Sequence, residues 1–178
     1  MSKSVPDFGP LLRSAERSAV HLEMHDSYAV ESEAEEFALW QSAGRRWEGG
    51  RAEAYWRPWT DLVAETVARG VEVRRARVVS EPVSEYIRFE HAATDWNVGA
   101  GERVAWLPRR LASDLALPGN DFWLIDDRAV RFNLFAGDGS LVDPDYTEDP
   151  RTVAMCADAF AAVWERAIPH AEFVLQSP

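Results

Sequence analysis

The sequence predicts an α/β domain of the mixed α+β type, in which helices flank a mixed β-sheet. Residues Ser18–His25 alternate between apolar and polar side chains, which is the period of a strand with one buried face. Residues Val71–Val79 are rich in β-branched side chains, which strands favour. The stretch from Pro82 to Trp96 instead repeats apolar residues at helical spacing. Strands separated by helices in this way favour a mixed sheet with helices on its faces.

Length, charge and cysteine content narrow the class of protein. At 178 residues the chain suits a single domain, in which residues 1–56 form an N-terminal extension. Its net charge of −11 argues against non-specific binding to nucleic acid, because phosphates repel an acidic surface. The single cysteine excludes an internal disulfide framework. No secretory signal and no apolar run of membrane-spanning length is found, so the cytoplasm is the expected location.

The first part of the chain predicts a short helix, a strand, a longer helix and a connection. A helix over Pro6–Glu16 has Asp7 as its candidate cap. The strand Ser18–His25 follows, and is expected to be half-buried. Residues Glu31–Ala43 predict a helix with glutamates near its start, where the helix dipole favours them. Residues Arg45–Tyr55 contain a glycine pair and little periodicity, so they are predicted to form a linker or flap.

Helices and strands then alternate. Pro58 is expected in the first turn of a helix that ends at Gly70. The strand Val71–Val79 comes next. Pro82 is expected to begin another helix, and a short strand covers Arg103–Leu107.

The last third predicts a hairpin and a closing helix. Strands over Phe122–Asp126 and Ala129–Phe135 are expected to join across Asp127-Arg128. Asp149-Pro150 supplies a cap and a first-turn proline for the closing helix, which Pro169 ends.

The strongest chemical signal is a group of arginines on the strand Val71–Val79. Arg75 and Arg77 share a face with valines. If that face is partly buried, the two guanidinium groups need carboxylates or a ligand anion as partners. Both alternatives stay open, because carboxylates that would form internal salt bridges are abundant nearby, at Glu81, Glu85 and Glu90.

A pocket is expected at the carboxyl ends of the strands, where ligands of open α/β sheets bind. The residues that follow the arginine-bearing strand would lie there, and aromatic side chains would line the wall. Helix capping and core packing explain the same residues without a ligand. The candidate ligand-binding residues are Arg75, Arg77, Ser80, Glu85, Tyr86, Arg109 and Trp123.

Neither a catalytic constellation nor a metal site is predicted, and no cofactor is expected. On a strand, Asp121 and Asp127 would lie roughly 20 Å apart, too far to share one ion. His21 and His25, on one strand face, would lie about 13 Å apart, beyond the reach of one zinc ion. Cys156 falls within the apolar stripe of the closing helix, which is typical of a buried cysteine and not of a nucleophile.

Several segments together resemble a family of actinobacterial proteins that carries a domain of unknown function. These segments are Phe8–Leu12, Val78–Tyr86, Leu117–Trp123 and Phe160–Ala167. The resemblance covers nearly the whole chain. Members of that family are often encoded beside helix-turn-helix regulators, which implies a regulatory role.

The second half of the chain is also similar to one lobe of the phospholipase D superfamily. The strand at Val71–Val79, the hairpin after Asp121 and the closing helix with Phe160 and Trp164 carry this similarity. It implies a phospholipase D-like lobe over residues 57–170. A working enzyme of that superfamily needs two catalytic motifs that face each other, whereas this chain offers one place for one motif.

The hairpin lacks the catalytic residues that this resemblance would require. In the superfamily the strand carries His-x-Lys-x-x-x-x-Asp, which supplies the nucleophile and the phosphate-binding cation. Counted back from Asp127, the His and Lys places hold Asn120 and Phe122. Counted back from Asp126, they hold a glycine and Asp121. The resemblance therefore implies the frame without its chemistry.

These patterns favour a non-enzymatic cytoplasmic binding or regulatory accessory protein. Its expected partner is a helix-turn-helix DNA-binding regulator, with no direct contact to nucleic acid or membrane. One alternative is a small-ligand sensor whose pocket is lined by arginine and glutamate, and the other is a degenerate hydrolase. A closed, aromatic-lined pocket would favour the sensor, whereas an exposed apolar patch would favour the partner-binding protein.

Overall fold

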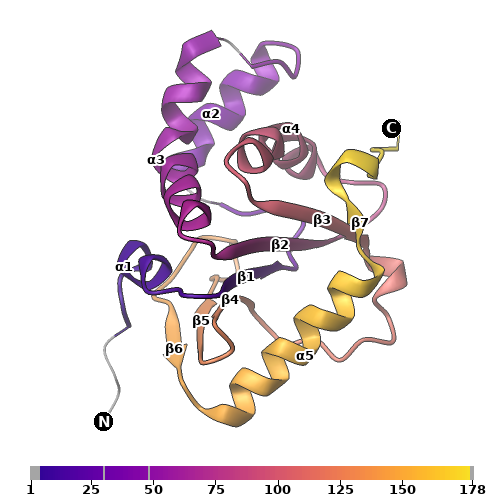
Figure 1. Ribbon diagram of the computed structural model, residues 1–178. Helices are drawn as coiled ribbons and strands as arrows, with labels where there is room; N and C mark the ends of the chain where they lie inside the picture. The colour runs from indigo at the N-terminus through magenta and orange to yellow at the C-terminus, as the bar shows by residue number, and fades with distance from the viewer. Residues whose placement is uncertain (1–4, 30, 48, 177–178) are drawn as a thin grey trace.

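The computed structural model describes residues 5–29, 31–47 and 49–176, which fold around a seven-stranded mixed sheet (Figure 1). The strands are β1 (Ser18–Glu23), β2 (Glu72–Val79), β3 (Arg103–Pro108), β4 (Asp121–Ile125), β5 (Ala129–Asn133), β6 (Asp145–Thr147) and β7 (Ile168–Pro169). Their order in the sheet is β6-β5-β4-β1-β2-β3-β7. β2 pairs in parallel with β1 and with β3, and the remaining neighbours are antiparallel. The predicted fold class, a mixed sheet flanked by helices, is confirmed.

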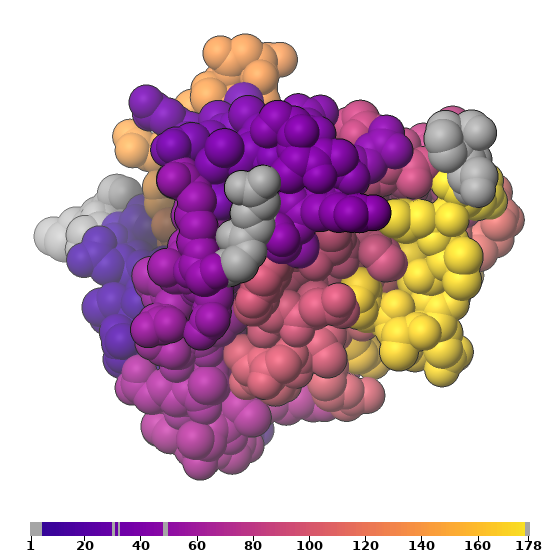
Figure 2. Space-filling model, turned by 90° about the horizontal axis from the view of Figure 1, so that it is seen from above, coloured from indigo at the N-terminus to yellow at the C-terminus, as the bar shows by residue number. Residues whose placement is uncertain are grey.

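Helices cover both faces of this sheet. They are α1 (Phe8–Arg13), α2 (Glu31–Ser42), α3 (Gly49–Ala68), α4 (Glu85–Gly99) and α5 (Pro150–Arg166), with 3-10 turns η1 (Arg109–Leu111) and η2 (His170–Glu172). Helix α5 crosses one face, and α1 to α4 lie over the other (Figure 1). Seen from above, α2, α3 and α4 form the surface of the molecule on their side (Figure 2).

The face under α5 is mostly apolar, although the Arg74 guanidinium also lies over Phe160 and Trp164. Alternate residues of the strands, such as Val20 and Leu22 of β1, pack against Cys156, Phe160 and Val163 of the helix. As predicted, the closing helix begins with a cap, because the Asp149 carboxylate accepts hydrogen bonds from the backbone N–H groups of its first turn. This face therefore serves as the main apolar core.

The opposite face is apolar only at its two ends. One cluster joins α1 to the sheet through Leu12, Val73 and Trp123, and another joins α4 to β3 through Phe89 and Trp106. Polar side chains of β1 and β2 occupy the stretch between these clusters: His21, Glu23, Arg75 and Arg77. The sheet therefore presents a buried polar strip on the side that α2, α3 and α4 cover.

The predicted linker or flap over Arg45–Tyr55 is wrong from Gly49 onward, where α3 begins. Pro58 lies inside this helix and not in its first turn. Glycine and proline both disfavour helix interiors. Trp56 and Trp59 pack against the two apolar clusters, and the helix continues through the glycine pair and the proline where these contacts form.

Three other element predictions need correction. β1 is not half-buried: it lies in the middle of the sheet, so both of its faces are covered. The helix expected at Pro82 begins at Glu85, where the Ser84 hydroxyl accepts a hydrogen bond from the backbone of the first turn. The hairpin connection spans Asp126–Arg128, one residue longer than the expected Asp127-Arg128, because β4 ends at Ile125, which pairs with Ala129. The short strand β6 is absent from the predicted elements.

Candidate functional site

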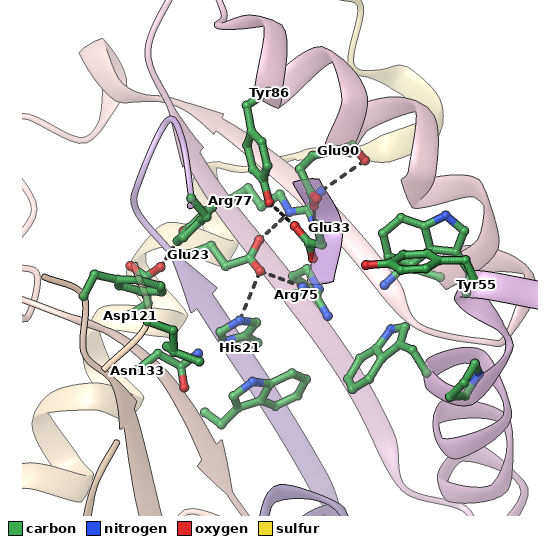
Figure 3. A pocket seen from close by; sticks show the side chains of 18 residues that line it. His21, Glu23, Glu33, Tyr55, Arg75, Arg77, Tyr86, Glu90, Asp121 and Asn133 are labelled. Carbon is green, nitrogen blue, oxygen red and sulfur yellow. Dashed lines mark hydrogen bonds and ion pairs between the residues drawn. The ribbon is translucent and has the colours of Figure 1, made fainter. Parts of the chain in front are cut away.

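A cavity of about 460 Å³ lies over the polar strip of the sheet, and Figure 3 shows its wall from close by. Its floor comes from β1, β2 and β4, and its sides come from α2, α3 and α4. The segments after β1 and after β5 complete the wall through Tyr28, Phe135 and Leu141. Elements far apart in the sequence therefore meet at one site.

The register between β1 and β2 places the charged side chains of the floor next to one another. His21 is opposite Arg75, and Glu23 is opposite Arg77, because β1 and β2 pair in parallel. Residues two apart on a strand point to the same face, so all four side chains face the cavity. The floor is therefore a patch of alternating charge.

Carboxylates already bind both arginines. Arg75 donates from Nη1 to Glu23 Oε1 at 2.6 Å and from Nε to Glu102 Oε1 at 2.7 Å. Arg77 donates from Nε to Glu23 and from Nη2 to Glu90. Although burial opposes the charged form, these carboxylates raise the pKa of both guanidinium groups. The predicted partner Glu90 is present, and Glu23 and Glu102 replace the expected Glu81 and Glu85.

Glu23 is the centre of this network. Burial by itself would raise the pKa of Glu23, but the charges of Arg77 and Arg75 hold it well below its usual range. Its Oε1 atom also lies 3.1 Å from His21 Nε2. The His21 ring stacks on Trp123 with 4.4 Å between centroids, and its Nδ1 lies 2.8 Å from the Phe122 carbonyl oxygen, to which it donates. Both ring nitrogens therefore have partners inside the protein.

Two further carboxylates of the wall accept hydrogen bonds from tyrosines. Glu33 accepts a hydrogen bond from the Tyr86 hydroxyl at 2.5 Å, and burial together with the charge of Glu90 raises its pKa to about 7. Asp121 accepts a hydrogen bond from the Tyr28 hydroxyl, and burial raises its pKa. Each carboxylate is thus held by a neutral phenol.

Aromatic side chains form most of the remaining wall. Trp56 and Trp59 enter from α3, Trp123 from β4, and Tyr28 and Tyr86 from the opposite side. The buried indole N–H groups of Trp56 and Trp59 have no acceptor among the described residues. A bound molecule with an oxygen acceptor would satisfy them.

The predicted ligand-binding residues divide into two groups. Arg75, Arg77, Tyr86 and Trp123 all line the cavity. The other three residues lie outside it, so the structure does not bring the predicted set together. These residues are Ser80, Glu85 and Arg109.

The three outlying residues have other contacts. The Ser80 hydroxyl donates to Asp26 Oδ2 at 2.6 Å and accepts from Arg109 Nε at 3.0 Å. Arg109 also donates to the carbonyl oxygens of Met24 and Val78, so it ties together the carboxyl ends of β1 and β2. Glu85 forms an exposed pair with Arg45, at 2.6 Å.

Sequence reasoning missed most of the acidic wall. His21 and Glu23 alternate on a strand beside the arginine-bearing strand, and this spacing was the available signal. Glu33, Glu90 and Asp121 come from three separate elements, and only the packing of these elements brings them together.

The cavity differs from sites built on a serine or cysteine nucleophile or on a metal ion. No serine, threonine or cysteine is among the residues that line the cavity. Cys156 is a residue of α5 and is buried where this helix packs on the other face of the sheet, and burial raises its pKa to about 11. Within residues 5–29, 31–47 and 49–176, no group of three histidine, cysteine or acidic side chains could hold a metal ion. In the same ranges, no helix is both long and apolar enough to cross a bilayer.

Residues 6–175 match the family described as "Domain of unknown function (DUF6879)". The chain belongs to this family. Membership in DUF6879 confirms the expected domain of unknown function, while the actinobacterial source and the neighbouring regulator stay predictions. No curated protein matches this DUF6879 sequence.

Two solved structures are similar to this DUF6879 domain. One is Nuc, a phospholipase D family member from Salmonella typhimurium, with a TM-score of 0.53 and 9% identity over 90% of this chain and 86% of that chain. The other is NucT from Helicobacter pylori, with a TM-score of 0.55 and 13% identity over 90% of this chain and 87% of that chain. At such identities the likeness concerns the fold alone, and it confirms the phospholipase D-like frame.

Proposed function

We propose that this DUF6879 protein is a non-enzymatic binding protein that holds a small organic molecule in the cavity. One observation carries this proposal: an aromatic wall borders a cavity of about 460 Å³ above a floor of paired charges. Ligand pockets occupy roughly 300–1,000 Å³ and combine apolar walls with a few placed polar groups. Of the functions predicted from the sequence, the small-ligand sensor fits this arrangement best.

The contacts of the polar groups favour binding over catalysis. A nucleophile or general base needs a free reactive atom directed at the substrate. Both nitrogens of His21 have partners, and the pKa values of the Tyr28 and Tyr86 hydroxyls are raised, mainly by burial. The phenols therefore stay protonated and serve as hydrogen-bond donors.

Ligand binding is tested by native mass spectrometry of the protein purified from its own host. The expected result is a bound small molecule that solvent extraction releases for identification. In parallel, a diverse compound library is screened by tryptophan fluorescence, because Trp56, Trp59 and Trp123 line the wall.

A matched pair of variants localises the binding. Trp59→Leu removes part of the wall and is expected to abolish the fluorescence response. Trp164→Leu removes a similar side chain from α5, on the other face of the sheet, and is expected to leave binding unchanged. An empty protein together with no response to any compound would overturn the proposal. The predicted partnership with a helix-turn-helix regulator stays a prediction, testable by co-purification.

A further inference from the structure

The two arginines on the floor are not available to bind an anion. Each guanidinium group contacts two carboxylates, and the side chains of Arg75 and Arg77 are only 10% and 5% exposed. An anionic ligand would have to displace one of these carboxylates and leave it buried without a cation, which is strongly unfavourable. The cavity therefore does not act as an anion site, despite its arginines.

Carboxylates outnumber cations around the cavity. Glu23, Glu33, Glu90 and Asp121 line it, and Glu102 lies behind Arg75. The cations that face this set are the guanidinium groups of the two arginines, with His21 beside Glu23 and His25 beside Asp121 as titratable partners. With every carboxyl group ionised and both imidazoles protonated, the set has one more negative group than positive groups, so the field inside then favours a positive charge.

The surplus negative charge lies at Glu33 and Asp121. The Glu33 carboxylate accepts a hydrogen bond from the hydroxyl of Tyr86. The Asp121 carboxylate accepts one from the hydroxyl of Tyr28, and its Oδ1 atom lies 3.1 Å from His25 Nδ1. Burial raises the pKa values of both carboxyl groups. A cation placed between them would stabilise their ionised forms, and for Glu33 it would add to the smaller effect of the Arg77 charge.

The walls also suit a cation. An ammonium or guanidinium group is attracted to the face of an aromatic ring, most strongly to that of tryptophan. The Arg75 guanidinium already lies over Trp59 at 5.4 Å and over Trp123 at 5.7 Å, measured to the ring centroids. The tryptophan-lined wall thus already binds one cation of the protein itself.

We propose that the cavity binds an organic cation, namely an ammonium group on a compact apolar body. The inference rests on the proposed function and names the chemical class of its ligand. The ammonium group lies on the acidic side of the cavity, near Glu33 and Asp121. The apolar body packs against Trp56 and Trp59 of α3.

Matched probes that share one apolar body and differ in the charge of their head group test this assignment. Isothermal titration calorimetry compares phenethylamine, phenethyl alcohol and phenylacetate, which share one aromatic body. Choline and its neutral carbon isostere form a second pair. We expect each cation to bind about tenfold more tightly than its neutral counterpart. The gain comes from a charge-assisted hydrogen bond for phenethylamine, and from cation–π and charge attraction for choline, which has no N–H group. Phenylacetate is expected not to bind.

Glu33→Gln connects this preference to the acidic wall. The variant keeps the shape and the acceptor oxygen of the side chain and removes its charge, so the preference for the cation is expected to fall about tenfold. Glu35→Gln, on the same helix and 76% exposed, is the matched control and is expected to keep the preference. Thermal unfolding of both variants verifies that they fold.

The outcomes separate the two proposals. If the neutral or anionic probe binds as tightly as the cation, the assignment of a cation is overturned and the proposed binding function stands. If the cation is preferred equally by Glu33→Gln and by the unaltered protein, the placement of the ammonium group is overturned. If no probe binds and no compound of the library changes the tryptophan fluorescence, both proposals fail.

Discussion

Glu23 and Glu33 carry the same side chain in one cavity and hold their protons differently. Glu23 contacts two arginines, which keep its pKa well below the usual range although burial opposes them. Glu33 accepts a hydrogen bond from a phenol, and burial raises its pKa to about 7. The neighbours therefore decide which carboxylate is a permanent charge and which one titrates near neutrality.

Glu33 should make the stability of the protein depend on pH. Tyr86 and Glu90 of α4, Glu23 of β1 and Arg77 of β2 face its carboxyl group. Its pKa is about 7 in the folded protein and 4.5 for an ordinary glutamate, so between these values the folded state holds a proton that the unfolded state has released. The free energy of unfolding therefore falls as pH rises through this window, and the loss is complete above about pH 7.

Glu33→Gln is the variant that checks this linkage. It should be more stable than the unaltered protein by about 1–2 kcal/mol near pH 8, after discounting for partial exposure, and equal to it near pH 4. Urea unfolding across this pH range measures the difference, with Glu35→Gln as control. A difference that does not change with pH would contradict the assignment.

Arg77 should be the most sensitive residue of the floor. Arg77→Met leaves Glu23 and Glu90 buried without their cation, which should lower the free energy of unfolding by roughly 3–5 kcal/mol. Arg45→Met breaks the exposed pair with Glu85 and should change it by less than about 1 kcal/mol. Urea unfolding compares the two variants, and adding Glu90→Gln to Arg77→Met should restore part of the loss. Equal effects of the two single variants would show that the buried network does not stabilise the fold.

Residue-level prediction succeeded where a signal lies within one strand. The spacing of Arg75 and Arg77 placed both on one face and required buried partners for them. Of those partners, Glu90 was among the residues considered, whereas Glu23 and Glu102 were not. Pairing across strands depends on register, which the sequence of a single strand does not contain.

At the scale of elements, the β4–β5 hairpin connects the sheet to the N-terminal segment. Asp126 and Asp127 have φ angles of 51° and 54°, and Arg128 N–H donates to the Ile125 carbonyl at 2.9 Å. Two successive left-handed residues are typical of a type I′ turn, which here forms part of the three-residue connection between Ile125 and Ala129. The Asp126 carboxylate accepts hydrogen bonds from three consecutive backbone N–H groups, those of Glu16, Arg17 and Ser18. The acidic pair therefore builds the turn and also holds the start of β1.

The two aspartates of this turn should respond differently to substitution. Asp126→Ala leaves the three N–H groups without their acceptor and should destabilise the protein by roughly 2–3 kcal/mol. Asp127→Gly should be neutral or slightly stabilising, because glycine adopts the left-handed conformation without strain. Thermal unfolding compares the two variants. If Asp127→Gly is the more damaging one, the assigned division of roles is wrong.

Element prediction failed where packing overrides local preference. β2, β3 and α5 follow their sequence signals closely, since period and caps agree there with the final environment. Helix α3 contradicts its own signals, because it begins at a glycine pair and contains Pro58. Trp56 and Trp59 gain contacts only when α3 lies over the sheet, and no local pattern reveals that arrangement.

At the scale of the whole molecule, the two faces of the sheet have different roles. The face under α5 buries a continuous apolar core. The other face separates two apolar clusters with a charged strip and encloses the cavity. A phospholipase D-like frame thus combines a stable core on one side with a polar, aromatic-walled site on the other.

This arrangement predicts that the protein neither hydrolyses nor retains phosphodiesters. Attack on phosphorus needs a free nucleophile and cations that stabilise the developing negative charge. Here the nitrogens of His21 have partners, and the guanidinium groups of Arg75 and Arg77 bind carboxylates. The acidic wall and the net charge of −11 repel a phosphate further.

Two assays check this last prediction, one with a chromogenic phosphodiester and one with a fluorescent DNA oligonucleotide. We expect no turnover above the buffer rate and no change in anisotropy at about 0.15 M salt. Turnover that disappears in His21→Ala and persists in His170→Ala, whose ring lies beyond the cavity, would contradict the prediction. Such a result would identify His21 as a reactive group despite its contacts, and the cavity would then be a hydrolytic site.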